Sequence, residues 1–142
     1  MGWDKLAQLD AVREEGKRAL LEYGEHELKM KQAEADKTMI EARVSAIDRA
    51  SAELLAAKPN PEFFGTSQDL AVWRSKLDEL AAKRMEFMTE VRGLNSIIST
   101  ERTAAIKLAH QIEGLRHSAR NLEAVVEGRS PASGFEGGVY RV

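Results

Sequence analysis

The three histidines are the residues of this chain best suited to catalysis or metal binding. His110 and His117 stand seven residues apart, which on one helix separates them by about 10.5 Å along the axis, too far to share one metal ion. The chain has no cysteine, so disulfides and thiolate metal sites are excluded. No glycine precedes a Lys-Ser or Lys-Thr pair as in a phosphate-binding loop, and no metalloprotease or Ser-His-Asp pattern occurs. We therefore expect no catalytic, metal-binding or cofactor-binding site and no enzymatic activity.

The composition of the chain limits which classes of partner it can bind. The net charge is −2, and basic residues are interleaved with acidic ones, so the sequence offers no basic patch to a nucleic acid. No apolar run reaches the roughly 18 residues of a membrane span, and the N-terminus lacks the pattern of a secretion signal. We expect protein partners rather than nucleic acid or membrane, and a location in a virion or in the cytoplasm.

A heptad pattern dominates both halves of the chain and predicts the elements that position these residues. Seam residues recur at alternating steps of three and four, which is typical of a coiled coil and incompatible with a strand. In the second half the seam is interrupted only by Arg84 and Glu101. The first seam comprises Leu9, Val12, Gly16, Ala19, Tyr23, His26, Met30, Ala33, Lys37, Ile40, Val44, Ile47, Ser51 and Leu54. The second comprises Leu70, Trp73, Leu77, Leu80, Arg84, Phe87, Val91, Leu94, Ile98, Glu101, Ala105, Leu108, Ile112, Leu115, Ala119, Leu122 and Val126.

Helix-breaking residues between and after the seams predict the boundaries. Two prolines, Pro59 and Pro61, end the first helix, and Thr66 or Ser67 caps the second. Gly128 is a natural helix stop. The sequence thus predicts an all-α protein: a long antiparallel two-helix coiled-coil hairpin over residues 1–127, with an extended Gly-rich C-terminal tail at 128–142. The helices are expected at about 4–57 and 68–127, joined by a tip at 58–67.

Folding back at the tip sets which seam residues meet. The predicted layers include Leu54 with Leu70, Ser51 with Trp73, Ile40 with Arg84, Lys37 with Phe87, His26 with Ile98, Tyr23 with Glu101, Ala19 with Ala105, and Gly16 with Leu108. Small residues then face large ones, as interdigitated packing requires. For His26 two interpretations stay open: a hydrogen-bonded core histidine, or a pH-sensitive weak layer.

Residues outside the seams indicate contacts with other proteins. Leu21, Leu28, Ala35 and Ala42 recur every seven residues on the outward side of the first helix. The outward row of the second helix has no Lys, Arg, Asp or Glu and reads Ser75, Ala82, Thr89, Ser96, Thr103, His110, His117 and Ala124. Because a face in contact with water alone would be charged, we expect Leu21 and Leu28 to bind a partner helix. The alternative is that these residues are simply solvated.

Aromatic and apolar residues at the tip and in the tail are further candidates for partner binding. Phe63 and Phe64 lie in the predicted tip, where they either contact a partner or close the open end of the hairpin. Phe135, Val139 and Tyr140 follow a flexible linker in the tail, a pattern found in segments that dock on a neighbouring protein.

These features favour a non-enzymatic structural or assembly protein that associates with other protein subunits, including copies of itself. The most concrete hypothesis is a virion component of a tailed phage, at the head–tail junction or in the tail. It rests on the general design of the chain.

A second hypothesis comes from a resemblance. Residues Gln68-Asp69-Leu70 to Trp73, followed by Leu77 and Leu80, resemble the start of the second helix in the export-stalk proteins of flagellar and type III secretion systems. The resemblance covers a few helical turns, and the Gly-rich aromatic tail departs from it. It implies a cytosolic stalk or chaperone that contacts the ATPase of the secretion apparatus.

Overall fold

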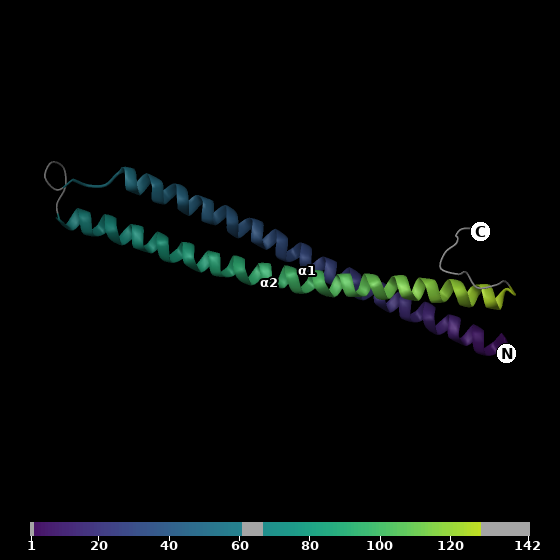
Figure 1. The fold of residues 1–142 in the computed structure, drawn as a ribbon. Helices are drawn as coiled ribbons and strands as arrows, with labels where there is room; N and C mark the ends of the chain where they lie inside the picture. Colours follow the sequence, from purple (N-terminus) through teal and green to yellow (C-terminus); the bar gives the residue numbers. More distant parts are fainter. Residues whose placement is uncertain (1, 61–66, 129–142) are drawn as a thin grey trace. The chain divides into compact units, whose positions relative to one another are not determined.

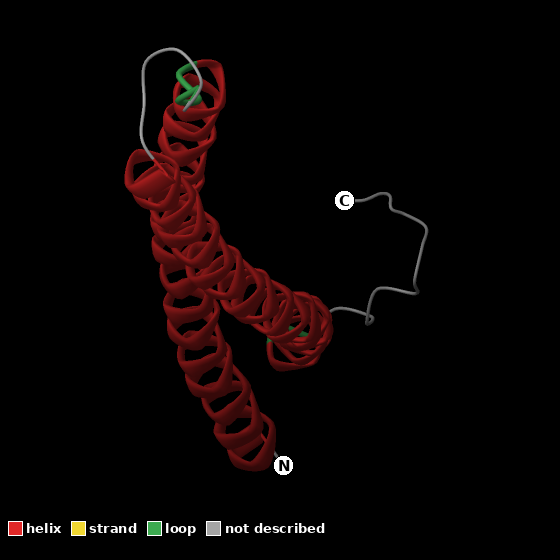
Figure 2. Cartoon of the chain, turned by 90° about the vertical axis from the view of Figure 1, so that its left-hand side faces the viewer, coloured by secondary structure: helices red, strands yellow, loops and turns green. Residues whose placement is uncertain are grey.

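Two helices make up almost all of the described structure. The computed structural model describes residues 2–60 and 67–128, and within these two ranges it contains no strand. Helix α1 spans Gly2–Ala56 and helix α2 spans Ser67–Val126 (Figures 1 and 2). The prediction of an all-α helical hairpin is confirmed.

The end of α1 combines a local stop with a contact from α2. The N–H of Ala57 donates to the carbonyls of Glu53 and Leu54, both at 3.1 Å, and Pro59 follows, which has no N–H to continue the ladder. The carbonyl of Leu54 also accepts a hydrogen bond of 2.6 Å from the indole N–H of Trp73. A side chain of α2 therefore supplies a second donor to one of the last carbonyls of α1, which lie beyond the regular i→i+4 ladder of the helix.

The ends of α2 follow the expected capping chemistry. Asp69 lies in the first turn, where its negative charge interacts favourably with the helix dipole. At the other end Gly128 has φ of +80°, a conformation that favours glycine, and its N–H donates to the carbonyl of Val125 at 3.1 Å. The prediction of Gly128 as the stop is confirmed, whereas Pro61 and Thr66 lie outside the described residues.

The two helices contribute to two compact units. The first unit is formed by α1 up to Lys29 with α2 from Glu101 onward, and the second unit by Met30–Thr100. In the first unit Ala19, Leu108 and Ile112 form a buried cluster. The buried apolar residues of both units, apart from Ala124, all belong to the predicted seams: Leu9, Ala19, Ala33, Val44, Ile47, Val91, Ile98, Ala105, Leu108 and Ile112.

The register of the second unit differs from the prediction. The guanidinium of Arg43 lies 5.9 Å from the centre of the Phe87 ring, whereas the predicted layer pairs Phe87 with Lys37. Arg84 donates from Nε to Oδ1 of Asp48 at 2.8 Å, again further along α1 than predicted. These two contacts lie six and eight residues closer to the C-terminal end of α1 than predicted, which is about one heptad.

The first unit shows a displacement in the same direction. Leu108 shares its cluster with Ala19 and with Tyr23, which packs against it, whereas the predicted layer pairs Leu108 with Gly16. Ala19 in turn contacts the cluster of Leu108 and Ile112 rather than forming an isolated layer of two alanines.

Flanking charges give a physical reason for the displacement. Asp36, Arg43, Lys83 and Glu90 each directly precede a seam residue. In the predicted register Asp36 would therefore lie beside Glu90, and Arg43 beside Lys83. Like charges at such flanking positions disfavour a register. In the structure Asp36, Glu90 and the oppositely charged Arg43 all line one groove.

Candidate protein-binding surfaces

His26 and Glu101 of the first unit contact each other between the two helices. Nδ1 of His26 lies 2.5 Å from Oε1 of Glu101, and their side chains are 24% and 15% exposed. The structure thus matches the interpretation of His26 as a hydrogen-bonded core histidine. The predicted layer of Tyr23 with Glu101 is wrong, because Tyr23 packs against the apolar cluster instead.

The other histidines occupy exposed positions. His110 and His117 are both exposed on α2. Among residues 2–60 and 67–128, no group of three or more His, Asp or Glu side chains is placed to hold a metal ion.

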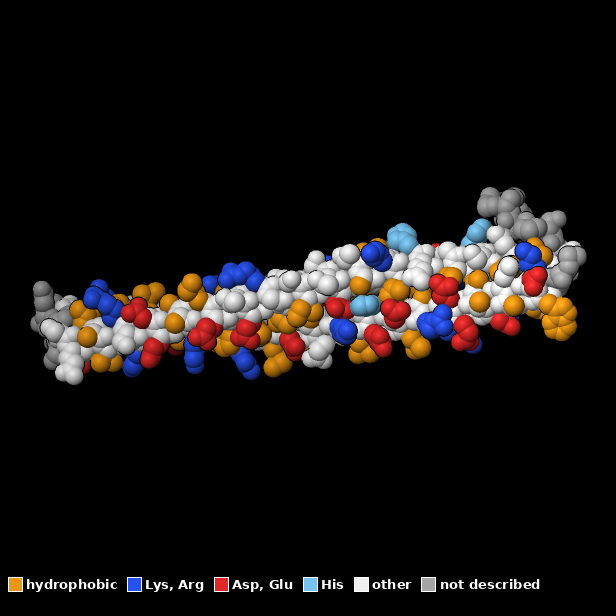
Figure 3. Space-filling view, turned by 90° about the horizontal axis from the view of Figure 1, so that it is seen from below, with side chains coloured by type: hydrophobic (Ala, Val, Ile, Leu, Met, Phe, Trp, Pro, Cys, Tyr) orange, Lys and Arg blue, Asp and Glu red, His pale blue; other side chains and the backbone are white. Residues whose placement is uncertain are grey.

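Leu21 and Leu28, the predicted partner-binding leucines, are exposed. Their exposed fractions are 71% and 69%, and both lie on the α1 segment of the first unit. An exposed leucine at each of two positions seven residues apart places two apolar side chains about 10.5 Å apart on one face of the helix. On the face that Figure 3 shows, apolar side chains are interspersed with charged ones of both signs.

The outward row of α2 is exposed except at its last member. Residues from Ser75 to His117 in this row are exposed, whereas Ala124 is only 6% exposed, contrary to the prediction. Burial continues in its neighbour Asn121, whose Oδ1 is buried without a hydrogen-bond partner among the described residues.

Five of the predicted partner-binding residues lie outside the described part of the chain. These are Phe63, Phe64, Phe135, Val139 and Tyr140. Their roles stay predictions.

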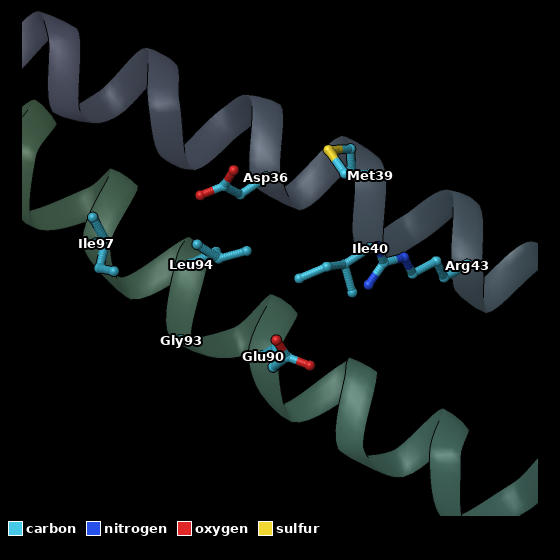
Figure 4. A pocket seen from close by; sticks show the side chains of 8 residues that line it. All are labelled: Asp36, Met39, Ile40, Arg43, Glu90, Gly93, Leu94 and Ile97. Atoms are coloured by element: carbon cyan, nitrogen blue, oxygen red, sulfur yellow. The ribbon is translucent and has the colours of Figure 1, made fainter.

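A groove in the second unit is a further candidate surface. It is open, has a volume of about 440 Å³, and lies between α1 and α2 (Figure 4). Its lining residues are Asp36, Met39, Ile40, Arg43, Glu90, Gly93, Leu94 and Ile97. The figure shows Ile40 and Leu94 reaching toward one another between the helices, with Asp36 and Arg43 at opposite ends of the α1 side.

Sequence reasoning missed this groove because it depends on the register. Met39 and Ile97, which are 58% and 46% exposed, lie outside the seams and come from different helices. Gly93 adds to the opening, since a side chain built there would meet no atom within 4 Å. Only the observed register brings these three residues to one groove.

In the described part of the chain, the charged residues of the groove form no ion pair. Within residues 2–60 and 67–128, Asp36 accepts a hydrogen bond of 3.1 Å from Gln32, and Arg43 lies over Phe87. No ion pair in those ranges involves Asp36, Arg43 or Glu90. Apolar walls with charged residues at the rim are the composition of a surface that binds another protein.

Comparisons with known proteins give no relative. No protein-family model matches the chain, and neither the curated proteins nor the solved structures contain a match. Neither of the described helices combines the length and apolar character needed to cross a membrane.

Proposed function

We propose that this chain is a non-enzymatic structural subunit of a multi-protein assembly, in which α1 and α2 form an antiparallel coiled coil. One observation carries the proposal: Leu21 and Leu28 stand 71% and 69% exposed on α1 of the first unit. Removing a leucine side chain from water stabilises a complex by about 1.5–3 kcal/mol, so the burial of two such side chains favours association. A spacing of seven residues suits another helix as the partner.

The most specific form of the proposal is a virion component of a tailed phage, at the head–tail junction or in the tail. Repeated copies of one subunit contact each other in such particles, and an α1 face with recurring leucines would serve as the repeated contact. The chain should then be found in purified particles. Co-purification with a hexameric secretion ATPase would instead support the stalk or chaperone function that the resemblance at the start of α2 implies.

Replacing both leucines by glutamate tests the contact. We expect the wild-type chain to have a mass in solution well above the 15.8 kDa of one chain, and Leu21→Glu/Leu28→Glu to reduce it. Light scattering after size-exclusion chromatography measures the mass, and far-UV circular dichroism should show unchanged helicity, because both positions are exposed.

A matched control separates the apolar contact from the added charge. Thr38 and Ser45 are exposed on the same helix and also stand seven residues apart. Thr38→Glu/Ser45→Glu adds the same charge and should leave the mass unchanged. The proposal is wrong if the leucine variant and the wild type have the same mass.

A further inference from the structure

We infer that the groove of the second unit binds a second copy of this chain, with the two α1 helices running antiparallel across the contact. The inference goes beyond the proposed function and does not rest on it. The groove residues lie within Met30–Thr100, whereas Leu21 and Leu28 belong to the first unit.

The α1 side of the groove has a charge pattern that complements itself. Asp36 and Arg43 are seven residues apart, so they stand about 10.5 Å apart along the axis, with Met39 near the midpoint. A two-fold rotation about an axis at this midpoint reverses the direction of the helix. It brings Asp36 of one copy to Arg43 of the other, and the reciprocal pair forms by symmetry.

The same rotation places apolar residues at the centre. Met39 of each copy then faces the half-buried Ile40 of the other copy. Methionine suits this place because its flexible side chain fills irregular gaps.

Small residues beside the groove allow the helices to approach. Ala35, Ala42 and Ala46 are all exposed on α1 within the second unit. Alanines at these positions permit a separation between helix axes at the short end of the usual 8–10 Å. Bulky exposed side chains would keep a second α1 too far away for the ion pairs.

The charges beside the groove are available for ion pairs across a contact. Neither Asp36 nor Arg43 forms an ion pair within residues 2–60 and 67–128, although both flank an apolar groove. A contact restricted to this groove is smaller than the roughly 1,200–2,000 Å² of stable interfaces, so the dimer should be weak and concentration-dependent.

Charge reversal tests the reciprocal pairing. We expect Asp36→Arg and Arg43→Asp each to weaken dimerisation at least about tenfold, because each variant creates two like-charge contacts. The double variant Asp36→Arg/Arg43→Asp should restore the wild-type affinity. Sedimentation equilibrium from about 1 to 500 µM measures the affinity, in the Leu21→Glu/Leu28→Glu background so that only this contact contributes.

Mixing the two single variants gives a sharper result. One copy then carries two arginines and the other two aspartates, so a heterodimer should form although neither variant dimerises well alone. Native mass spectrometry with one variant isotopically labelled counts the heterodimer. Asp78→Arg, a charge reversal at an exposed position on α2, is the control and should leave dimerisation unchanged.

Three outcomes would overturn the inference. The first is a monomer at all concentrations in the Leu21→Glu/Leu28→Glu background. The second is weakening by Arg43→Asp but not by Asp36→Arg, which would mean that Arg43 meets a different acidic residue such as Glu90. The third is a mixture of the single variants that forms no heterodimer. None of these bears on the leucine contact of the proposed function.

Discussion

Truncating Leu108 to alanine should be among the most destabilising single changes in this chain. Leu108 is 9% exposed and lies in the buried cluster with Ala19 and Ile112, and Tyr23 and Leu115 pack against that cluster. The substitution removes three carbon atoms, and at about 0.8 kcal/mol for each buried carbon the transfer term is about 2.4 kcal/mol. A cavity term adds to it, as in larger cores.

Two effects keep the total loss in the free energy of unfolding near the lower end of the range for truncated buried leucines. Two helices leave part of any cavity open to water and to rearrangement of neighbouring side chains, so the cavity term is small. Alanine also favours the helix slightly more than leucine does. We therefore expect the free energy of unfolding to fall by about 2–3 kcal/mol.

Urea unfolding followed by far-UV circular dichroism measures this loss, at a fixed protein concentration because association would also contribute. Leu21→Ala is the matched control. At 71% exposure its truncation should change the free energy of unfolding by less than about 0.5 kcal/mol. Equal effects at Leu108 and Leu21 would refute the assignment of the buried face of α2.

Two further changes probe polar contacts between the helices. Trp73→Phe removes the indole donor to the carbonyl of Leu54, and we expect a loss of about 1 kcal/mol in the same urea assay; no loss would show that water replaces the donor at no cost. Glu101→Ala leaves the half-buried His26 without its partner and should cost about 1–3 kcal/mol, whereas His26→Leu/Glu101→Leu should recover that loss or exceed the wild-type stability. Finding the double variant less stable than Glu101→Ala would contradict this account of the pair.

The positions of the two helices could be predicted from the sequence because their signals are local. A heptad pattern marks each helix over many turns, and the breakers Pro59 and Gly128 lie at or beside the observed ends. The burial of Leu9, Ile47 and Ile112 follows from the same pattern.

The register could not be predicted from the seams, because any regular heptad fits its partner equally well after a shift of seven residues. Size complementarity, such as Ser51 opposite Trp73, does not determine the register, since the indole of Trp73 contacts Leu54. The flanking charges discriminate between registers: Asp36 beside Glu90 and Arg43 beside Lys83 would repel in the predicted register.

Of the two candidate surfaces, one could be predicted from the sequence and the other could not. Leu21 and Leu28 could be found from the sequence, since both belong to one helix and one heptad position. The groove could not, because Met39 and Ile97 come to the same place only once the register is known.

The bond from Trp73 to Leu54 links the stability of the last turn of α1 to its neighbour. Helix ends normally fray on their own, and their amide hydrogens exchange quickly with solvent. Here the carbonyl of Leu54 is shared between the N–H of Ala57 and an indole supplied by α2. If deuterium uptake at the amide of Ala57 is slow, its rate would report the separation of the two helices in the second unit rather than the fraying of α1 alone.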